Sequence, residues 1–208
     1  MIKYDIEELF PTPLIKVKVE ENTEQLKFIN DYTTSSVDKN GQTLGNMRVL
    51  EQHPNIRDLL LSKFNHVAEE YLQYKRRKYI ITTSWITQTR IGSRSQLHSH
   101  RNSFWSGVYY FQDEYEMGSA KLSFSNPNEH RADVYFDESD IEQYTKSNSN
   151  AWIITPKSKM LLLFPSYLEH EILVHNVDTE RLSLAFNIMP TGRSVSYTHL
   201  TLPTKCWV

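Results

Sequence analysis

The sequence predicts a mainly β protein of the jelly-roll or β-sandwich type, with flanking helices. Two observations support this fold class. After residue 78 the chain is rich in β-branched and aromatic residues, in short runs separated by turn signals such as Gly118-Ser119. Long helical patterns do not alternate with these runs, as they would in a parallel α/β sheet.

The first part of the chain contains the clearest helix. Residues 14–19 alternate apolar and polar side chains and predict a strand. Residues 22–33 predict a short helix, and the polar, glycine-containing residues 34–47 predict a loop. Apolar residues recur at three- and four-residue steps over about 55–75, and Pro54 suits the first helical turn. We expect this helix to pack against a sheet.

The rest of the chain predicts strands. Residues 79–89 form the longest candidate, rich in Ile, Thr and aromatic side chains. Further candidate strands are residues 105–112, 120–125, 151–155, 159–164, 171–175 and 181–188. Residues 137–147 predict a brief helix or an ordered loop over one mouth of the sandwich.

Composition describes an ordinary globular domain. The 208 residues include 23 Lys plus Arg and 25 Asp plus Glu, a net charge of −2, which argues against a nucleic-acid partner. Apolar runs fall well short of the ~20 residues of a membrane span, and the acidic start does not resemble a signal peptide. The one cysteine, Cys206, allows no intrachain disulfide. We expect a cytoplasmic protein with no membrane partner.

The last fifteen residues, 194–208, look foreign to the domain. Residues 195–204 resemble one translated reading frame of an adaptor used in DNA library preparation. Such segments are excluded from reasoning about the fold. We therefore predict a single domain over residues 1–193; the alternative for the tail is an ordinary C-terminal strand.

Three of the eight histidines form a candidate metal site. His98 and His100 are two residues apart, so on a strand both rings project to the same face. His170 lies far away in sequence, after an apolar strand. Two ligands from one segment and a third from a distant one give a facial arrangement that leaves coordination positions open for catalysis.

Arg181 opens a strand that alternates cleanly. Arg181, Ser183, Ala185 and Asn187 share one face, and large apolar residues share the other. An arginine on the inward face would carry a buried charge, which costs several kcal/mol unless an anion compensates it. A guanidinium binds a carboxylate with two parallel hydrogen bonds. Arg181 and Ser183 are therefore the candidate carboxylate anchor beside the metal.

The combination of His98-x-His100, His170 and Arg181-x-Ser183 resembles the 2-oxoglutarate/Fe(II)-dependent dioxygenase superfamily. Other segments are similar to a family of 2-oxoglutarate/Fe(II) oxygenases from marine bacteria and phages. These segments are Leu9-Phe10-Pro11-Thr12-Pro13, Ser106-Gly107-Val108-Tyr109-Tyr110-Phe111 and Phe164-Pro165-Ser166 with His170. The resemblance covers roughly residues 8–192.

The resemblance implies a double-stranded β-helix of the jelly-roll, cupin-like type. It implies Fe(II) bound by His98, the residue at position 100 and His170, with 2-oxoglutarate anchored on Arg181 and Ser183. In related enzymes a tyrosine on the strand after the first metal motif also contacts the co-substrate. Alternation lets only one of Tyr109 and Tyr110 point inward, and we select Tyr109.

His100 departs from the superfamily pattern, which usually has Asp or Glu at the second ligand position. An imidazole there leaves the site one negative charge short. Three interpretations follow: iron held by three histidines, iron held by two with His100 turned away, or a site that does not bind iron productively. Carboxylates nearby in sequence are possible substitutes but are not favoured. They are Asp113, Glu169 and Glu171.

The resemblance implies an enzyme that uses dioxygen and 2-oxoglutarate to hydroxylate a substrate, with release of succinate and CO2. One alternative is a cupin-like three-histidine metalloenzyme that does not use 2-oxoglutarate. Another is a non-catalytic β-sandwich acting as a binding or phage structural module. The sequence does not identify the substrate or the oligomeric state, and the loops at 34–47 and 126–150 are candidates for selecting the substrate.

Overall fold

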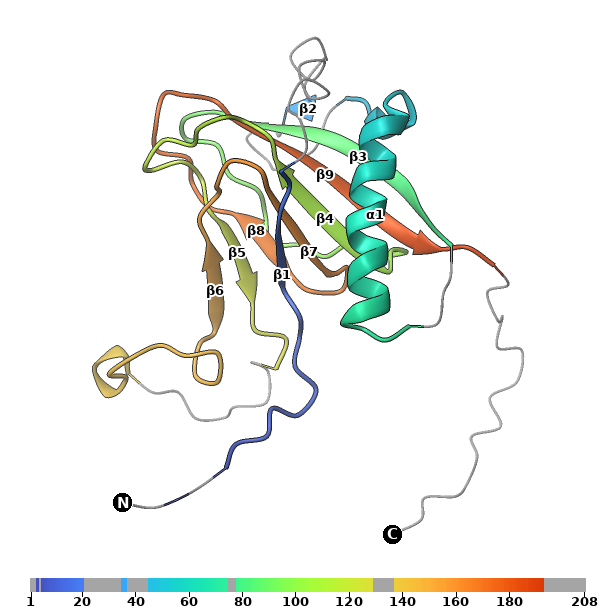
Figure 1. Ribbon diagram of the computed structural model, residues 1–208. Helices are drawn as coiled ribbons and strands as arrows, with labels where there is room; N and C mark the ends of the chain where they lie inside the picture. The colour runs from blue at the N-terminus through green and yellow to red at the C-terminus, as the bar shows by residue number, and fades with distance from the viewer. Residues whose placement is uncertain are drawn as a thin grey trace, which may run out of the picture.

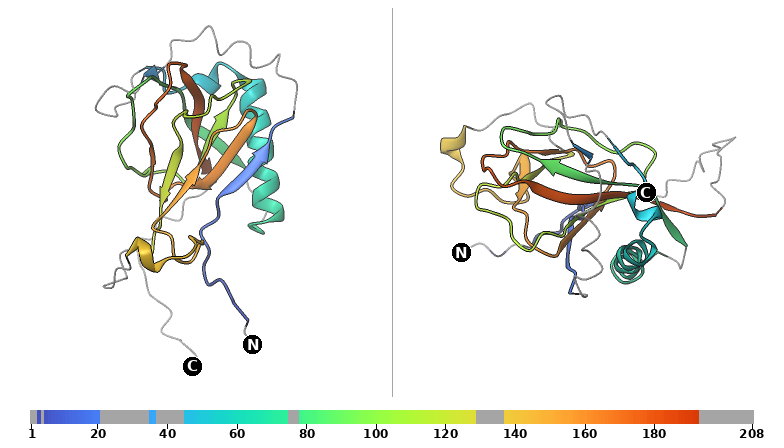
Figure 2. Two further views of the ribbon diagram at one scale, coloured as in Figure 1. Left: turned by 90° about the vertical axis from the view of Figure 1, so that its left-hand side faces the viewer. Right: turned by 90° about the horizontal axis from the view of Figure 1, so that it is seen from above.

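The computed structural model consists of two facing sheets with one long helix on the outside (Figures 1 and 2). It describes residues 3, 5–20, 35–36, 45–74, 78–128 and 137–192. The strands are β1 (Ile15–Lys18), β2 (Ser35–Ser36), β3 (Tyr79–Thr89), β4 (Trp105–Tyr110), β5 (Leu122–Ser125), β6 (Ala151–Ile154), β7 (Met160–Pro165), β8 (His170–Ile172) and β9 (Arg181–Pro190). The helices are α1 (Pro54–Glu70) and the short 3-10 turns η2 (Val49–Glu51) and η4 (Glu138–Asp140).

Strand pairing defines a six-stranded and a three-stranded sheet. The large sheet has the order β1-β7-β4-β9-β3-β2 and the small one the order β6-β5-β8. All pairs are antiparallel except that of β2 with β3. Strands β3 and β9 pair over almost their whole length, with one register shift between Ile81 and Thr83. This long ribbon carries Arg181 at one end and Asn187 near the other.

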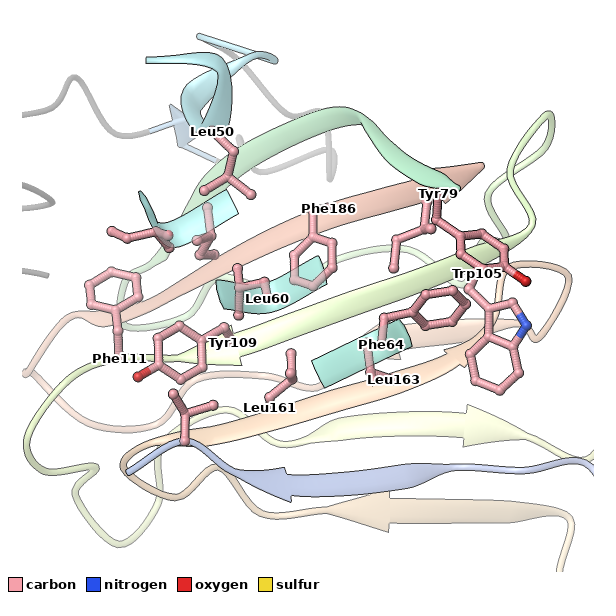
Figure 3. Close-up of a cluster of buried hydrophobic side chains, with 14 of the residues drawn as sticks. Leu50, Leu60, Phe64, Tyr79, Trp105, Tyr109, Phe111, Leu161, Leu163 and Phe186 are labelled. Carbon is pink, nitrogen blue, oxygen red and sulfur yellow. The ribbon is translucent and has the colours of Figure 1, made fainter. Parts of the chain in front are cut away.

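Helix α1 covers the outer face of the large sheet (Figures 1 and 2). Pro54 stands at its first turn, where a missing amide hydrogen costs nothing. Its apolar side packs Leu60 and Phe64, both fully buried, against sheet residues such as Phe186 (Figure 3). The Phe64 ring meets the Tyr79 ring edge-on, with centroids 5.0 Å apart. The helix therefore closes one face of the sheet with an aromatic core.

A second core lies between the two sheets. Val108 from β4 and Leu162 from β7 belong to the same buried cluster as Leu122, Phe124 and Ile154 from the small sheet. Because both sheets contribute to one cluster, they pack face to face as a sandwich. The central strands β4 and β7 are buried along their whole length, covered by α1 on one side and the small sheet on the other.

Most predicted elements are present, but residues 35–36 of the predicted loop form the short strand β2, and the strand predicted at 171–175 is the shorter β8. The strand predicted at 79–89 has these bounds, and the helix predicted at about 55–75 spans Pro54–Glu70. The helix predicted at 22–33, most of the loop at 34–47 and the tail 194–208 lie outside the described residues. Among the helices that are described, none has the length and apolarity needed to cross a membrane.

Candidate metal and co-substrate site

The three predicted histidines meet at one end of the sandwich interior. One ring nitrogen from each of His98, His100 and His170 lies within 4.8 Å of the other two. The ring centroids are 4.5 to 5.2 Å apart. His98 is exposed, His100 is half-buried and His170 is buried. The structure thus places the three rings around a common point with one side open to solvent.

Backbone hydrogen bonds hold the histidine segments together. His98 and His170 are directly opposite in an antiparallel bridge, and each amide donates to the other's carbonyl, at 3.0 and 2.9 Å. Directly paired residues carry their side chains on the same side of the ladder. The His100 amide donates to the Ser166 carbonyl at 2.9 Å, so His100 is held against the turn that leads from β7 to His170. Pairing of two residues that are 72 positions apart therefore sets the spacing of these ligands.

Each histidine ring is hydrogen-bonded through Nδ1. His98 Nδ1 lies 2.8 Å from the Gln96 carbonyl, and His170 Nδ1 lies 2.9 Å from the Leu168 carbonyl. Because a carbonyl only accepts, these rings carry their proton on Nδ1, and the Nε2 lone pair is left for a metal. Nε2 of the three rings forms no hydrogen bond with any residue that the structure describes.

Burial keeps two of the rings neutral. It lowers the pKa of His170 to about 3, an effect that the neighbouring His98 strengthens. Burial also lowers the pKa of His100, against the opposing effect of its hydrogen bond to Asn187. A metal binds only the neutral imidazole, so at neutral pH these rings are in the form a metal requires.

Arg181 is buried without a compensating carboxylate. Its side chain is 1 % exposed, and its hydrogen bonds go to the Thr89 hydroxyl at 3.3 Å and the Tyr110 hydroxyl at 3.0 Å. Nε has no hydrogen-bond partner, and no acidic side chain among the described residues forms an ion pair with Arg181. A buried guanidinium without an anion is costly, so this site fits an anionic ligand.

Tyr110 contacts Arg181 and lies on the opposite face of β4 from Tyr109, the tyrosine selected from the sequence. The Arg181 guanidinium carbon lies 5.1 Å from the Tyr110 ring centroid. Tyr109 points to the opposite face of β4 and packs in the core under α1, with Leu161 nearby (Figure 3). Alternation places adjacent residues on opposite faces, and the pairing of β4 between β7 and β9 fixes which face each takes.

A row of small side chains lies between Arg181 and the histidines. The predicted alternation of β9 is present: Ser183 and Ala185 are buried on the face of Arg181, while Leu184 and Phe186 belong to the core under α1. Ser183 is opposite Thr87 on β3, and Asn187 is opposite Thr83. Asn187 reaches His100 directly, at 2.7 Å from its Nδ1. The inner face of the ribbon thus connects the anion anchor to the candidate metal site.

A surface cavity of about 890 Å³ lies outside this row. His100 is the one candidate ligand on its wall, and Arg181, Ser183 and Tyr110 do not line it. Its walls come mainly from the residues that follow α1, from residues 99–105 and from Pro11, Pro13 and Pro165. The site's chemistry therefore belongs to the sandwich interior and not to this cavity.

Sequence reasoning missed several polar residues of the site. Asn187 was placed on the inward face but given no role, Tyr110 was the alternative not selected, and Ser106, Ser166 and Thr89 were given no role in the site. Ser106 and Ser166 are completely buried in otherwise apolar strands and turns. A polar residue on the inward side of a fully apolar strand is the signal that could have found them.

Comparison with known proteins agrees with this geometry. Residues 83–187 match the family described as "Putative 2OG-Fe(II) oxygenase". This range runs from within β3 through most of β9 and includes all three histidines and Arg181. No curated protein sequence matches the chain.

Solved structures share the fold at low sequence identity. HygX from Streptomyces hygroscopicus, with nickel and 2-oxoglutarate bound, has a TM-score of 0.57 at 12% identity, over 86% of this chain and 83% of that one. A prolyl-4-hydroxylase from Pseudomonas putida has a TM-score of 0.54 at 12% identity, over 87% and 89%. The carbocyclase SnoK from nogalamycin biosynthesis has a TM-score of 0.55 at 13% identity, over 91% and 85%.

These findings confirm the double-stranded β-helix fold and the family. The chain belongs to the 2OG-Fe(II) oxygenase family, whose members are enzymes that use iron(II) as cofactor and 2-oxoglutarate as co-substrate. The three-histidine cluster and the buried arginine fit those two groups: neutral imidazoles suit iron, and an uncompensated guanidinium suits a dicarboxylate.

Proposed function

We propose that His98, His100 and His170 bind Fe(II) through Nε2, and that Arg181 binds the distal carboxylate of 2-oxoglutarate. When bound, iron and 2-oxoglutarate supply dioxygen activation: one oxygen atom enters a substrate C–H bond as a hydroxyl, and the other enters succinate as CO2 is released. The observation that carries the proposal is the buried Arg181 guanidinium with an unpartnered Nε. The substrate is not identified.

The protein's own residues prepare this site in three ways. Nδ1 hydrogen bonds fix the ring orientations and present Nε2 to the metal. Tyr110 and Thr89 hold the guanidinium in place before the co-substrate arrives, which reduces the ordering cost of binding. Ser183, on the same face of β9 two residues from Arg181, is positioned to add a hydroxyl hydrogen bond to the same carboxylate.

Anaerobic titration tests this assignment. The apoprotein is loaded with Fe(II) and then with 2-oxoglutarate, and the visible metal-to-ligand absorption of the chelated complex is followed. We expect Arg181→Ala to raise the 2-oxoglutarate dissociation constant by about 30-fold or more, as loss of one partner of a buried charge pair does. Fe(II) binding should be unchanged. Arg181→Lys keeps the charge but lacks the planar guanidinium. Its dissociation constant for 2-oxoglutarate should lie between those of the wild type and Arg181→Ala.

Arg90→Ala is the matched control. Arg90 also lies near the start of β9, and its replacement by alanine removes the same charge. Its side chain, however, is exposed and pairs with Glu180 at 2.9 Å. It should leave the 2-oxoglutarate affinity within about twofold, as expected for a surface ion pair. Equal losses in the Arg181 and Arg90 variants, or a wild-type protein that binds Fe(II) but shows no band with 2-oxoglutarate, would contradict the assignment.

A further inference from the structure

The three histidines differ in what holds Nδ1. For His98 and His170 the partner is a backbone carbonyl two residues earlier in the chain. For His100 the partners are side chains: Asn187 Oδ1 at 2.7 Å and Ser106 Oγ at 2.9 Å. His100 also occupies the ligand position at which related enzymes usually have a carboxylate. Among the three candidate ligands, His100 is therefore the one whose ring orientation depends on other side chains.

Asn187 is held in the orientation in which its side-chain oxygen accepts a hydrogen bond from His100. Its amide nitrogen donates to the Thr83 hydroxyl at 2.9 Å, directly across the β3–β9 ribbon. This leaves Oδ1 facing His100, and an amide oxygen can only accept. Nδ1 of His100 must then carry the proton, and Nε2 keeps its lone pair.

A chain of buried hydroxyls supports the same ring. Ser106 Oγ lies 2.8 Å from Asn187 Oδ1 and 2.7 Å from Ser166 Oγ, and both serines are completely buried. Ser166 donates to Ser103 at 2.9 Å, and Ser103 donates to the Trp105 carbonyl at 3.1 Å. Ser106 donates to Asn187 Oδ1, so the network ties Ser106 and Asn187 to each other as well as to the His100 ring. A buried network of this kind is stable only when each member is satisfied.

We propose that Asn187 is a positioning residue that, together with Ser106, makes His100 a metal ligand in place of the usual carboxylate. This inference rests on the proposed metal site and concerns the orientation of one ligand within it. Asn187 supplies the acceptor for Nδ1–H without adding negative charge. The three candidate ligands are therefore all imidazoles, and neutralising the charge of the cation is left to the dicarboxylate co-substrate.

The test measures Co(II) affinity of the metal-free protein by competition with a chelator, in the absence of 2-oxoglutarate. Asn187→Leu removes the acceptor and should weaken Co(II) binding by about 10- to 100-fold, as outer-shell mutations at metal sites do. Asn187→Asp keeps the acceptor and adds a charge, so it should bind Co(II) at least as tightly as the wild type. Ser106→Ala removes the weaker of the two acceptors and should cause a smaller loss than Asn187→Leu.

The Co(II) absorption spectrum separates positioning from general stability. The Asn187→Leu spectrum should resemble that of His100→Ala, because both lose the same nitrogen ligand. Ser84→Ala is the matched control. Ser84 lies on β3 and, like Ser106, is a buried serine. Its hydroxyl accepts a hydrogen bond from the Leu50 amide at 2.8 Å and forms none with the histidines. It should lower the melting temperature but leave the Co(II) affinity and spectrum unchanged.

Two results would overturn the inference. One is wild-type Co(II) affinity and spectrum in Asn187→Leu. The other, which still decides the matter if Asn187→Leu fails to fold, is a folded Asn187→Asp whose Co(II) spectrum matches that of His100→Ala. Failure of the proposed function itself looks different, because the wild-type protein would then bind no Co(II), or would bind it without any response to 2-oxoglutarate.

Discussion

At the scale of single residues, the partners of a histidine's two nitrogens indicate what the ring does. His175 is fully buried, and both of its nitrogens are used: Nδ1 accepts from the Ala120 amide at 2.9 Å, and Nε2 lies 2.6 Å from the Thr179 carbonyl. Such a ring has no lone pair to offer. His98 and His170 each use Nδ1, and Nε2 of each forms no hydrogen bond with the residues that the structure describes. The contrast marks His175 as structural.

Burial of His170 predicts that metal-free protein loses stability in mild acid. The pKa of this ring is about 3 in the folded state and about 6.5 in the unfolded chain, so only the unfolded state binds a proton between these values. The stabilisation is complete above pH 6.5 and falls as pH decreases toward 3. We expect a loss of about 2 kcal/mol at pH 5, measured by urea unfolding in the presence of a chelator.

His170→Gln isolates this contribution from those of the carboxylates. The variant lacks the titrating ring, so its free energy of unfolding should depend less on pH between 7 and 5 than that of the wild type. Parallel pH profiles for the two proteins would show that His170 protonates as easily in the folded state as in the unfolded chain.

At the scale of elements, close approach of β4 to β9 explains a glycine. A Cβ atom built on Gly107 would lie 2.2 Å from Phe186 Cζ, far inside van der Waals contact. Gly107→Ala should therefore destabilise the protein by about 3 kcal/mol, the upper part of the usual range for overpacking. Guanidinium unfolding of the variant measures this loss.

Shortening the opposing ring should relieve the clash. Phe186→Leu costs stability alone, because Phe186 is fully buried in the core under α1. Combined with Gly107→Ala, it should cost less than the sum of the two single changes, since residues in direct contact are coupled. Additive losses in this double-mutant cycle would mean that the strain lies elsewhere.

Elements with a clear local pattern could be predicted, and the orientation of β4 could not. Residues 79–89 and the helix beginning at Pro54 have strong periodicity, and both are present. Strand β4 is buried on both faces, and Ser106 is its single polar residue, so its sequence carries no clear polar face to set the phase. Tyr109 and Tyr110 are therefore equivalent in the sequence, and only pairing with β7 and β9 distinguishes them.

At the scale of the whole molecule, the candidate site could be predicted because its chemistry is concentrated in few residue types. Three histidines and one arginine on an inward face are informative wherever they lie in sequence. The supporting network was not predictable, because Ser106, Ser166 and Asn187 are ordinary residues whose roles arise from contacts 60 to 87 positions apart. Sheet order is likewise a property of long-range pairing.

Metal binding should stabilise the whole fold. The site joins the loop before β4 to the first residue of β8, so a bound cation favours the folded state by mass action. At a free metal concentration about 100 times the dissociation constant, the gain is about 2.7 kcal/mol. This corresponds to a rise in melting temperature of roughly 5–11 °C for a domain of this size.

Thermal unfolding with Fe(II) under argon, or with Co(II), measures this gain, and a chelator should reverse it. His98→Ala should show a much smaller rise. The contrary result is a wild-type melting temperature that does not change at metal concentrations that saturate binding. It would mean that the cation binds the unfolded chain as well as the folded one.

The reciprocal main-chain bonds between His98 and His170 have an evolutionary consequence. Backbone amides and carbonyls are the same for every amino acid, so substitutions in neighbouring positions leave the separation of these two ligands unaltered. The surrounding walls are thus free to diversify toward new substrates while the reactive centre keeps its dimensions. One scaffold can therefore acquire many specificities through substitutions outside the candidate metal site.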